Sequence, residues 1–297
     1  MKLIAKSFAK VNPYLKITGL KENGYHELDI SYLSVNLADR LELERTQTGT
    51  VRIATEAEIP LEDNLCFKVA VRLQETCDPG AGVEITLSKG IPIGGGLGGG
   101  SSDAATTLIG LNRLWNCGLT RQQLVEIGGE FGADIPFFFY GGYCVGRGTG
   151  NDIRQLHNPY STRLVPVITP SFSQLTREVY AKYDELVDHP GKNSDTRKKR
   201  PGANRRERKV RNDLQEPAVR LNPDLDHYLD LLEGVTTIDA FGVSGSGSSV
   251  FGVTKPGVHR KQVRAEINEE LEDLPGDQRL EITRPTGSGQ IITEGEP

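Results

Sequence analysis

The sequence predicts an α+β fold, and three observations support that prediction. Alternating, β-prone runs fill the first 55 residues, amphipathic helical patterns dominate the middle, and a second set of strands and helices starts near residue 160. A chain of 297 residues is long enough for two domains or one elaborated domain, with an open sheet backed by helices. We place one domain at 1–158 and a second at 159–297.

The first unit begins with strands because apolar and polar residues alternate there, and helices follow where apolar residues recur at helical spacing. One of these helices starts with a capping box, in which Gln123 follows Thr120 by three residues. In chain order we expect strands at 11–18, 28–37, 41–45 and 51–53, a helix at 64–75, a strand at 83–88, helices at 102–115 and 120–131, and a glycine-rich strand region at 141–150.

The second unit repeats the mixture of strands and helices. In chain order we expect a strand at 163–168, a helix at 174–187, a helix near 225–232, a strand at 237–243, a glycine-serine turn at 244–249, a strand at 250–253, a helix at 258–271 and a strand at 280–283. The polar tail at 287–297 is expected to fray.

The charge of the chain is unevenly distributed. The net charge is −5, but residues 189–211 hold ten Lys or Arg and two acidic residues, which leaves −13 for the rest. This basic segment has almost no apolar residues, so we expect an exposed insertion loop. A general nucleic-acid binder is not expected from so acidic a remainder.

Composition also excludes several classes of protein. No stretch approaches the roughly 18 apolar residues of a membrane span, and the amino terminus lacks the long apolar core of a secretion signal. The histidines are dispersed, so neither a zinc site nor a serine hydrolase triad is supported. We expect a cytoplasmic protein whose scattered cysteines are reduced, buried thiols: Cys66, Cys77, Cys117 and Cys144.

A glycine-rich loop between a predicted strand and a predicted helix is the most informative segment. Six of the seven residues from Gly94 to Gly100 are glycine. Glycines let the backbone approach a ligand closely, and the following helix offers unpaired N–H groups and the positive end of its dipole. The segment therefore predicts a site for a polyphosphate.

Two familiar phosphate loops do not explain it. The Walker pattern needs a lysine that Gly100-Ser101-Ser102 lacks, and Leu119 stands where a dinucleotide fold would have its ribose-binding acid. A flexible linker is not favoured either, because the loop runs directly into an amphipathic helix.

Three separated motifs together resemble the GHMP superfamily of small-molecule kinases. They are Ala9-Lys10-Val11-Asn12, the run 92–105, and the run 243–251. Further segments are similar to the branch of that superfamily that phosphorylates a cytidine diphosphate polyol: Gly24-Tyr25-His26, Asp63-Asn64-Leu65, and the runs 132–136 and 212–217. The match extends over nearly the whole chain. It implies a ribosomal-S5-like N-terminal domain, a ferredoxin-like C-terminal domain and an active site in the cleft between them.

The resemblance implies transfer of the ATP γ-phosphoryl group to the 2-hydroxyl of the polyol, in non-mevalonate isoprenoid precursor biosynthesis, with Mg²⁺ required. Asp134 matches the catalytic carboxylate and Lys10 its paired lysine. Ser102 is the candidate near the metal. The residues implied to bind ATP are Asn64, Leu65, Lys89, Pro92, Gly94, Gly95, Gly96, Leu97, Gly98, Gly99, Gly100, Ser101 and Ser102.

The substrate residues implied by the resemblance surround a base and a polyol. Tyr25 and Tyr180 would stack on cytosine, His26 would bind its edge, and Asn12 would bind the polyol, with Thr176 as a further hydroxyl. The expected partner is this small molecule, with neither membrane nor nucleic acid, and the chain is expected to be a monomer or weak homodimer.

Two alternatives stay open. Another GHMP kinase would act on a mevalonate-type, homoserine or sugar substrate, and would lack a base-sized pocket formed by Tyr25, His26 and Tyr180. A nucleotide-regulated binding protein would instead use the basic segment to hold an acidic or nucleic-acid partner. Its RNA binding would survive Asp134→Ala and be lost when residues 192–211 are deleted.

Overall fold

The computed structural model describes residues 1–57, 59–187, 210–272 and 277–295. The expected α+β class is confirmed, with two sheets and helices packed against them. Most of the basic segment expected at 189–211 lies outside the described residues. None of the helices in the described ranges combines the length and apolar character that a membrane crossing needs.

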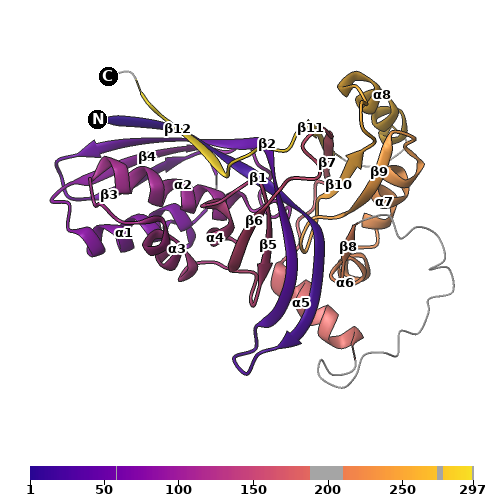
Figure 1. Cartoon of the computed structure of the whole chain (residues 1–297), viewed down its shortest axis with the longest axis horizontal. Coiled ribbons are helices and arrows are strands. Elements are labelled where there is room, and N and C mark those ends of the chain that lie inside the picture. The colour runs from indigo at the N-terminus through magenta and orange to yellow at the C-terminus, as the bar shows by residue number, and fades with distance from the viewer. Residues whose placement is uncertain (58, 188–209, 273–276, 296–297) are drawn as a thin grey trace.

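The first sheet is built on one long antiparallel hairpin. Its strands, β1 (Lys2–Leu20) and β2 (His26–Thr46), continue beyond the helix-covered part of the sheet towards the second half of the molecule (Figure 1). The strand order is β12-β1-β2-β4-β3, with β5 on β2, β6 on β5 and β8 on β1. The added strands are β3 (Val51–Thr55), β4 (Gly82–Ser88), β5 (Tyr143–Arg147), β6 (Asp152–Leu156), β8 (Arg211–Asn212) and β12 (Gln290–Glu294).

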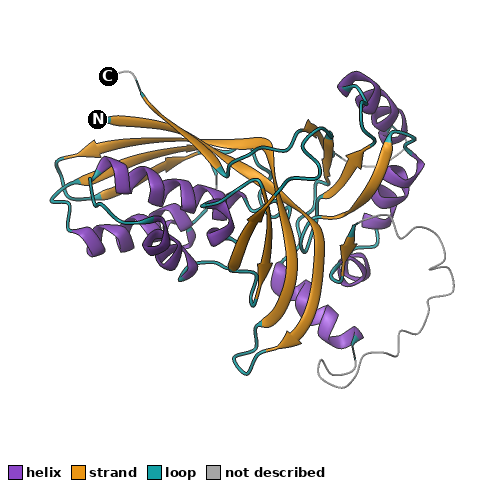
Figure 2. Ribbon diagram, in the orientation of Figure 1, coloured by secondary structure: helices purple, strands orange, loops and turns teal. Residues whose placement is uncertain are grey.

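Helices pack on one face of this sheet (Figure 2). They are α1 (Leu65–Cys77), α2 (Gly99–Leu114), α3 (Arg121–Gly129) and the short α4 (Ile135–Phe138). Leu43 of β2, Val69 of α1 and Leu108 of α2 are fully buried in the core between sheet and helices. The expected capping box of Thr120 and Gln123 is confirmed at the start of α3. Because α2 begins at Gly99, three residues before the predicted start, the glycine loop leads directly into its first turn.

The second sheet has the order β11-β7-β10-β9, all antiparallel. Its strands are β7 (Val165–Thr169), β9 (Ile238–Val243), β10 (Val250–Thr254) and β11 (Arg279–Thr283), close to the expected ranges. The helices of this half are α5 (Thr176–Leu186), α6 (Gln215–Leu221), α7 (Leu225–Gly234) and α8 (Arg260–Leu271). A 3₁₀ turn at Leu61–Asp63 precedes α1 in the first half.

The end of the chain corrects one expectation. The prediction that residues 287–297 fray is wrong for 290–294, which form β12 and pair antiparallel with β1 from Leu3 to Ser7. The polar composition was misleading because an edge strand needs apolar residues on only one face. The last strand therefore belongs to the first sheet, and the division at residue 158 stays a proposal.

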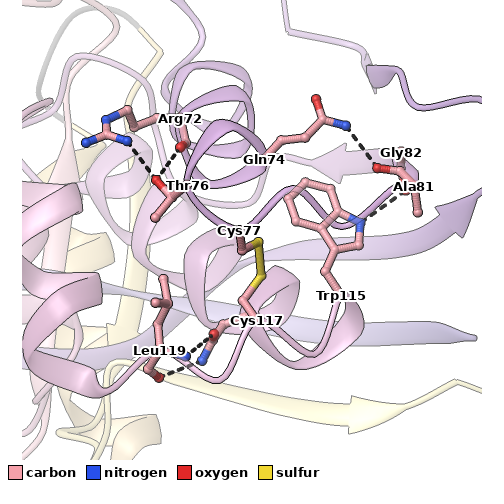
Figure 3. The surroundings of a disulfide bond; sticks show 10 residues. Arg72, Gln74, Thr76, Cys77, Ala81, Gly82, Trp115, Cys117 and Leu119 are labelled. Atoms are coloured by element: carbon pink, nitrogen blue, oxygen red, sulfur yellow. Dashed lines mark hydrogen bonds between the residues drawn. A yellow bond between two sulfur atoms is a disulfide. The ribbon is translucent and has the colours of Figure 1, made fainter.

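The cysteine prediction is wrong for two of the four residues. Cys77, at the end of α1, and Cys117, after α2, form a disulfide with a Cα–Cα distance of 5.5 Å, while Cys66 and Cys144 are free and buried (Figure 3). The two residues are 40 positions apart, and only the side-by-side packing of the two helices brings them together. Trp115 Nε1 donates to the Gly82 carbonyl beside the bridge, at 3.2 Å.

Candidate active site

A cavity of about 860 Å³ is lined by both halves of the molecule. Its walls come from the β1–β2 hairpin, the glycine loop, the residues before α1 and α4, helix α5 and the loop after β9. All the predicted site residues except Ser102 line it. The sequence prediction therefore selected residues that are distant in the chain and adjacent in space.

The glycine loop adopts a conformation that only glycine reaches easily. Gly94, Gly96 and Gly98 have φ of +72°, +72° and +70°. A Cβ on Gly96 would lie 2.2 Å from the Ser244 carbonyl oxygen, so the loop after β9 packs directly on the glycine backbone. The glycine loop and the N-terminus of α2 together form a concave stretch of backbone, called the glycine cradle below, whose N–H groups can bind phosphate.

Hydrogen bonds hold this loop from both halves. The Lys10 N–H of β1 donates to the Leu97 carbonyl at 2.9 Å. From the other side, the Ser249 N–H donates to the Gly95 carbonyl at 3.1 Å, and the Ser244 hydroxyl donates to the Gly96 carbonyl at 3.1 Å. The glycine loop is thus fixed between β1 and the loop of residues 244–249.

The two serines at the start of α2 differ in position. Ser101 lines the cavity, whereas Ser102 is fully buried and is absent from the cavity wall. The Ser102 hydroxyl has no hydrogen-bond partner among the described residues. Leaving a buried hydroxyl without a hydrogen-bond partner costs free energy unless a ligand supplies one. Ser102 therefore stays a candidate for contact with a bound metal or phosphate.

Lys10 and Asp134 face each other across the cavity wall. Lys10 Nζ lies 3.5 Å from Asp134 Oδ2, and it donates to Asn12 Oδ1 at 2.7 Å. The Lys10 side chain is 5% exposed and that of Asp134 34%, so the lysine is held within the wall and the carboxylate reaches the cavity. Asp134 directly precedes α4.

Asn12 reaches the same place because β1 is irregular there. The register of β1 against β2 shifts between Val11 and Tyr14, which leaves Asn12 and Pro13 unpaired with β2. Such a bulge re-aims side chains and accommodates a proline. Asn12 Nδ2 donates to the Ser31 carbonyl at 3.0 Å, and this fixes the amide that receives Lys10.

Lys89, which was expected to flank the adenine, is paired with two buried carboxylates of the protein. Its Nζ donates to Asp39 Oδ2 at 2.5 Å and to Asp103 Oδ2 at 2.8 Å. Asp39 Oδ1 also accepts the N–H groups of Gly90 and Ile91, at 2.6 and 2.7 Å. Sequence reasoning missed both carboxylates, because Asp39 is 50 residues away from Lys89 and meets it only through the pairing of β2 with β4.

The charges in this cluster perturb one another. Burial raises the pKa of Asp103 to about 7, although Lys89 beside it acts in the opposite direction. Burial opposes the charge on Lys89, but Asp103 and Asp39 outweigh it and raise the lysine pKa. The cluster ties the end of β4, the entry to the glycine loop and the first turns of α2 into one unit.

The far end of the β1–β2 hairpin lies beside α5 (Figure 1). The proposed base-binding residues come from these two elements, Tyr25 and His26 from the hairpin and Tyr180 from α5. His26 stacks on Tyr180 with ring centroids 4.8 Å apart, and its Nε2 lies 2.7 Å from Asp184 Oδ1. Tyr25 is 64% exposed. His26 therefore covers one face of Tyr180 in this structure. Its expected contact with the edge of cytosine stays a prediction.

Helix α5 contributes two further groups that the sequence prediction missed. Arg177 and Asp184 both line the cavity. Within the described residues Arg177 has no ion-pair partner, whereas the lining lysines Lys10 and Lys89 each face a carboxylate. The sequence did contain one signal for Arg177, because it directly follows the predicted substrate residue Thr176. The Thr176 hydroxyl lies 3.0 Å from that of Ser246.

Comparison with known proteins finds the superfamily that the sequence motifs resemble. The model of the GHMP kinases N-terminal domain matches residues 64–142, and that of the GHMP kinases C-terminal domain matches residues 194–273. The chain is 38% identical over 262 residues to a curated 4-diphosphocytidyl-2-C-methyl-D-erythritol kinase of Exiguobacterium sibiricum, covering 86% of this chain and 90% of the relative. It is 36% identical over 261 residues to the protein of the same name from Bacillus anthracis, covering 85% and 88%.

A solved structure agrees with these relatives. A crystal structure of a 4-(cytidine 5'-diphospho)-2C-methyl-D-erythritol kinase superposes with a TM-score of 0.74 at 28% identity. The superposition covers 96% of this chain and all of the other.

Proposed function

The chain belongs to the GHMP kinase family, and on that premise we propose that it transfers the γ-phosphoryl group of ATP to the 2-hydroxyl of 4-diphosphocytidyl-2-C-methyl-D-erythritol. The observation that carries the proposal is the pair of Lys10 and Asp134 in one cavity with the glycine loop and with Tyr25, His26 and Tyr180. Phosphoryl transfer requires positioning and charge neutralisation, and this cavity offers groups for both.

ATP would place its β- and γ-phosphates in the glycine cradle, where backbone N–H groups and the α2 dipole favour negative charge. Asn64 and Leu65 lie at the start of α1, on the same cavity, and would flank the adenine with the aliphatic stem of Lys89. The Lys89 ammonium would act mainly through Asp39 and Asp103, which support the loop.

Mg²⁺ would bind at the same end of the cavity, beside the phosphates. Among the described residues no cluster of three or more His, Cys, Asp or Glu could hold a metal ion, so most ligands would be phosphate oxygens and water, as is usual for this ion with nucleotides. Ser101 and the unpaired hydroxyl of Ser102 are the candidate protein groups. When bound, the ion would neutralise charge on the phosphates.

The proton and the bonds balance in a single displacement. The 2-hydroxyl oxygen of the polyol forms a bond to the γ-phosphorus, the bond from that phosphorus to the bridging oxygen breaks, and ADP leaves. Asp134 accepts the hydroxyl proton. Lys10 stabilises the developing negative charge beside it, and Asn12 positions the polyol.

The remaining groups suit a nucleoside diphosphate. Tyr25 and Tyr180 would provide aromatic faces for cytosine, and His26 a polar group for its edge. Because His26 covers one face of Tyr180, the base would stack on the exposed Tyr25, or on Tyr180 once His26 has moved away. Arg177 and Thr176 would contact the diphosphate, which neither homoserine nor mevalonate possesses. We further propose a cytoplasmic monomer or weak homodimer with domains at 1–158 and 159–297.

A coupled ADP-release assay tests the proposal with purified protein, ATP and Mg²⁺. The acceptors are diphosphocytidyl methylerythritol, mevalonate and homoserine, each with wild type and Asp134→Asn. Turnover with the cytidyl acceptor alone, lost in the variant, supports the proposal. Turnover with mevalonate or homoserine instead would keep the kinase activity and reject the base-binding assignment.

A further inference from the structure

Tyr32 lies behind the reacting groups, outside the cavity wall. It belongs to β2, and it is 1% exposed. Its hydroxyl lies 3.2 Å from Asp134 Oδ1 and 3.2 Å from the Gly150 carbonyl oxygen. A buried tyrosine hydroxyl thus reaches the carboxylate oxygen opposite the one that faces Lys10.

The ring of Tyr32 is fixed by stacking. It lies parallel to Phe137 with centroids 4.7 Å apart and an interplanar angle of 16°. Phe137 follows Asp134 by three residues and belongs to α4, so the same stacking contact positions the backbone that carries Asp134. The β2 strand and α4 therefore meet through one aromatic pair.

The hairpin of β5 and β6 leaves space for the hydroxyl end of Tyr32. A Cβ on Gly150, which has φ of +92°, would lie 2.6 Å from the Tyr32 hydroxyl oxygen. A Cβ on Gly146 would lie 3.0 Å from its ring. The two glycines form a socket that holds a ring with a hydroxyl at this position.

The hydroxyl remains a proton donor at any ordinary pH. Burial, and then the charge of Asp134 and its hydrogen bond, raise the pKa of Tyr32 well above its usual value. The hydroxyl has one hydrogen and two acceptors, and an ionised carboxylate is the stronger acceptor. Each carboxylate oxygen has two lone pairs, so Asp134 can accept from Tyr32 and still receive a proton from the substrate.

We propose that Tyr32 is a positioning residue for phosphoryl transfer: its hydroxyl fixes the rotation of the Asp134 carboxylate so that the carboxylate meets the acceptor hydroxyl. This role rests on the proposed function, in which Asp134 accepts the proton. Lys10 holds Oδ2 from β1 and Tyr32 holds Oδ1 from β2, so the carboxylate is oriented by two groups on neighbouring strands. Proton acceptors must be held within hydrogen-bond reach of their target, so a loosened carboxylate slows the chemical step.

Tyr32→Phe is the direct test because it removes the hydroxyl and keeps the stacked ring. Loss of the hydrogen bond to the charged carboxylate lowers kcat by about 10- to 100-fold. The KM values for ATP and for the acceptor stay within about twofold, because the hydroxyl touches neither ligand.

The other groups around Asp134 stay in place in this variant. They are Lys10 on β1 and Tyr180 on α5, whose pKa is raised mainly by burial and in part by Asp134. Tyr143→Phe is the matched control, because Tyr143 pairs with Leu33 in the same sheet and is absent from the cavity wall. It keeps wild-type kcat and KM.

A second variant keeps the test valid if Tyr32→Phe is poorly folded, which thermal melting would reveal. Gly150→Ala, made in the otherwise wild-type chain, directs a methyl group at the Tyr32 hydroxyl, so it lowers kcat while the KM values stay within about twofold. Assays use whichever acceptor the wild type phosphorylates, so a wrong acceptor assignment does not affect them. Unchanged kcat in Tyr32→Phe would overturn the role of Tyr32, as would full activity in Asp134→Asn.

Discussion

At the scale of single residues, the site depends on where each charge finds a partner. Lys10 is held by Asn12 and Asp134, and Lys89 by Asp39 and Asp103. These lysines therefore organise protein groups as much as they attract a ligand. Arg177 differs, because it faces the cavity without an ion-pair partner among the described residues.

Arg177→Ala should raise KM for the cytidyl acceptor about tenfold, since a charge-assisted hydrogen bond to the diphosphate is lost. The kcat should change by less than about threefold because Arg177 is remote from the reacting atoms in the proposed arrangement. Steady-state kinetics at two salt concentrations measure both. Lys182→Ala removes the same charge from the same helix but lies outside the cavity wall, so its KM should match wild type. Equal KM values in the two variants would place the diphosphate elsewhere.

The residues that sequence reasoning found and missed differ in a physical way. Lys10, Asp134 and the glycines stand in recognisable motifs, and the structure places them on one cavity. Tyr32 and Asp39 stand outside these motifs and act through contacts that depend on strand register and helix packing, whereas Asp103 lies within the run 92–105 and only its pairing with Lys89 was missed. No local pattern encodes such contacts, so they became visible only with the fold.

At the scale of elements, the support of the glycine loop is a buried charge cluster. Asp39 is fully buried and Asp103 nearly so, with Lys89 between them. Two carboxylates facing one ammonium leave one excess negative charge, which favours a proton on Asp103. The folded state therefore binds a proton that the unfolded chain releases at lower pH.

This cluster predicts a pH-dependent stability. The pKa of Asp103 is about 7 in the folded protein against 3.8 for an unperturbed aspartate, so between those pH values the folded state holds more protons than the unfolded state. The contribution of Asp103 to stability is present below that window and falls as pH rises towards 7, by up to about 1.4 kcal/mol per pH unit.

Urea unfolding of wild type and Asp103→Asn at pH 5, 6, 7 and 8 measures this dependence. The free energy of unfolding of wild type should fall relative to the variant between pH 5 and 7, and the difference should level off above 7. A difference that does not vary with pH would show that Asp103 is ionised throughout.

Helices α1 and α2 are joined near their C-terminal ends by the disulfide (Figure 3). The residues at their N-terminal ends line the cavity. A bridge between residues 40 positions apart is expected to stabilise the fold by about 3–4 kcal/mol, because it reduces the conformational entropy of the unfolded chain. Addition of a thiol reductant should therefore lower the melting temperature of wild type. A Cys77→Ser/Cys117→Ser variant should melt at the lower temperature with or without reductant. A reductant-insensitive wild type would mean that the two thiols are not bridged in solution.

At the scale of the whole molecule, the cavity lies where the hairpin and the glycine loop of the first half meet α5 and the loop after β9 of the second. The glycine loop of the first half is bonded to residues 244 and 249 of the second, and α5 reaches the tip of the long hairpin. The α+β class and most elements followed from periodicity. The return of β12 to the first sheet did not, because a short polar edge strand resembles a tail in sequence. Neither did the disulfide, whose partners meet only after α1 and α2 pack.

Phosphorus NMR of the reaction product shows whether the γ-phosphoryl group of ATP reaches C2 of the polyol. Wild type with ATP, Mg²⁺ and diphosphocytidyl methylerythritol should yield ADP and a new phosphate monoester on C2 of the polyol, with the substrate's diphosphate resonances retained. Asp134→Asn should slow its appearance by about 10²- to 10⁴-fold, as expected for loss of a positioned proton acceptor. ADP with only inorganic phosphate, or a monoester formed equally fast in Asp134→Asn, would contradict transfer through Asp134 to this hydroxyl.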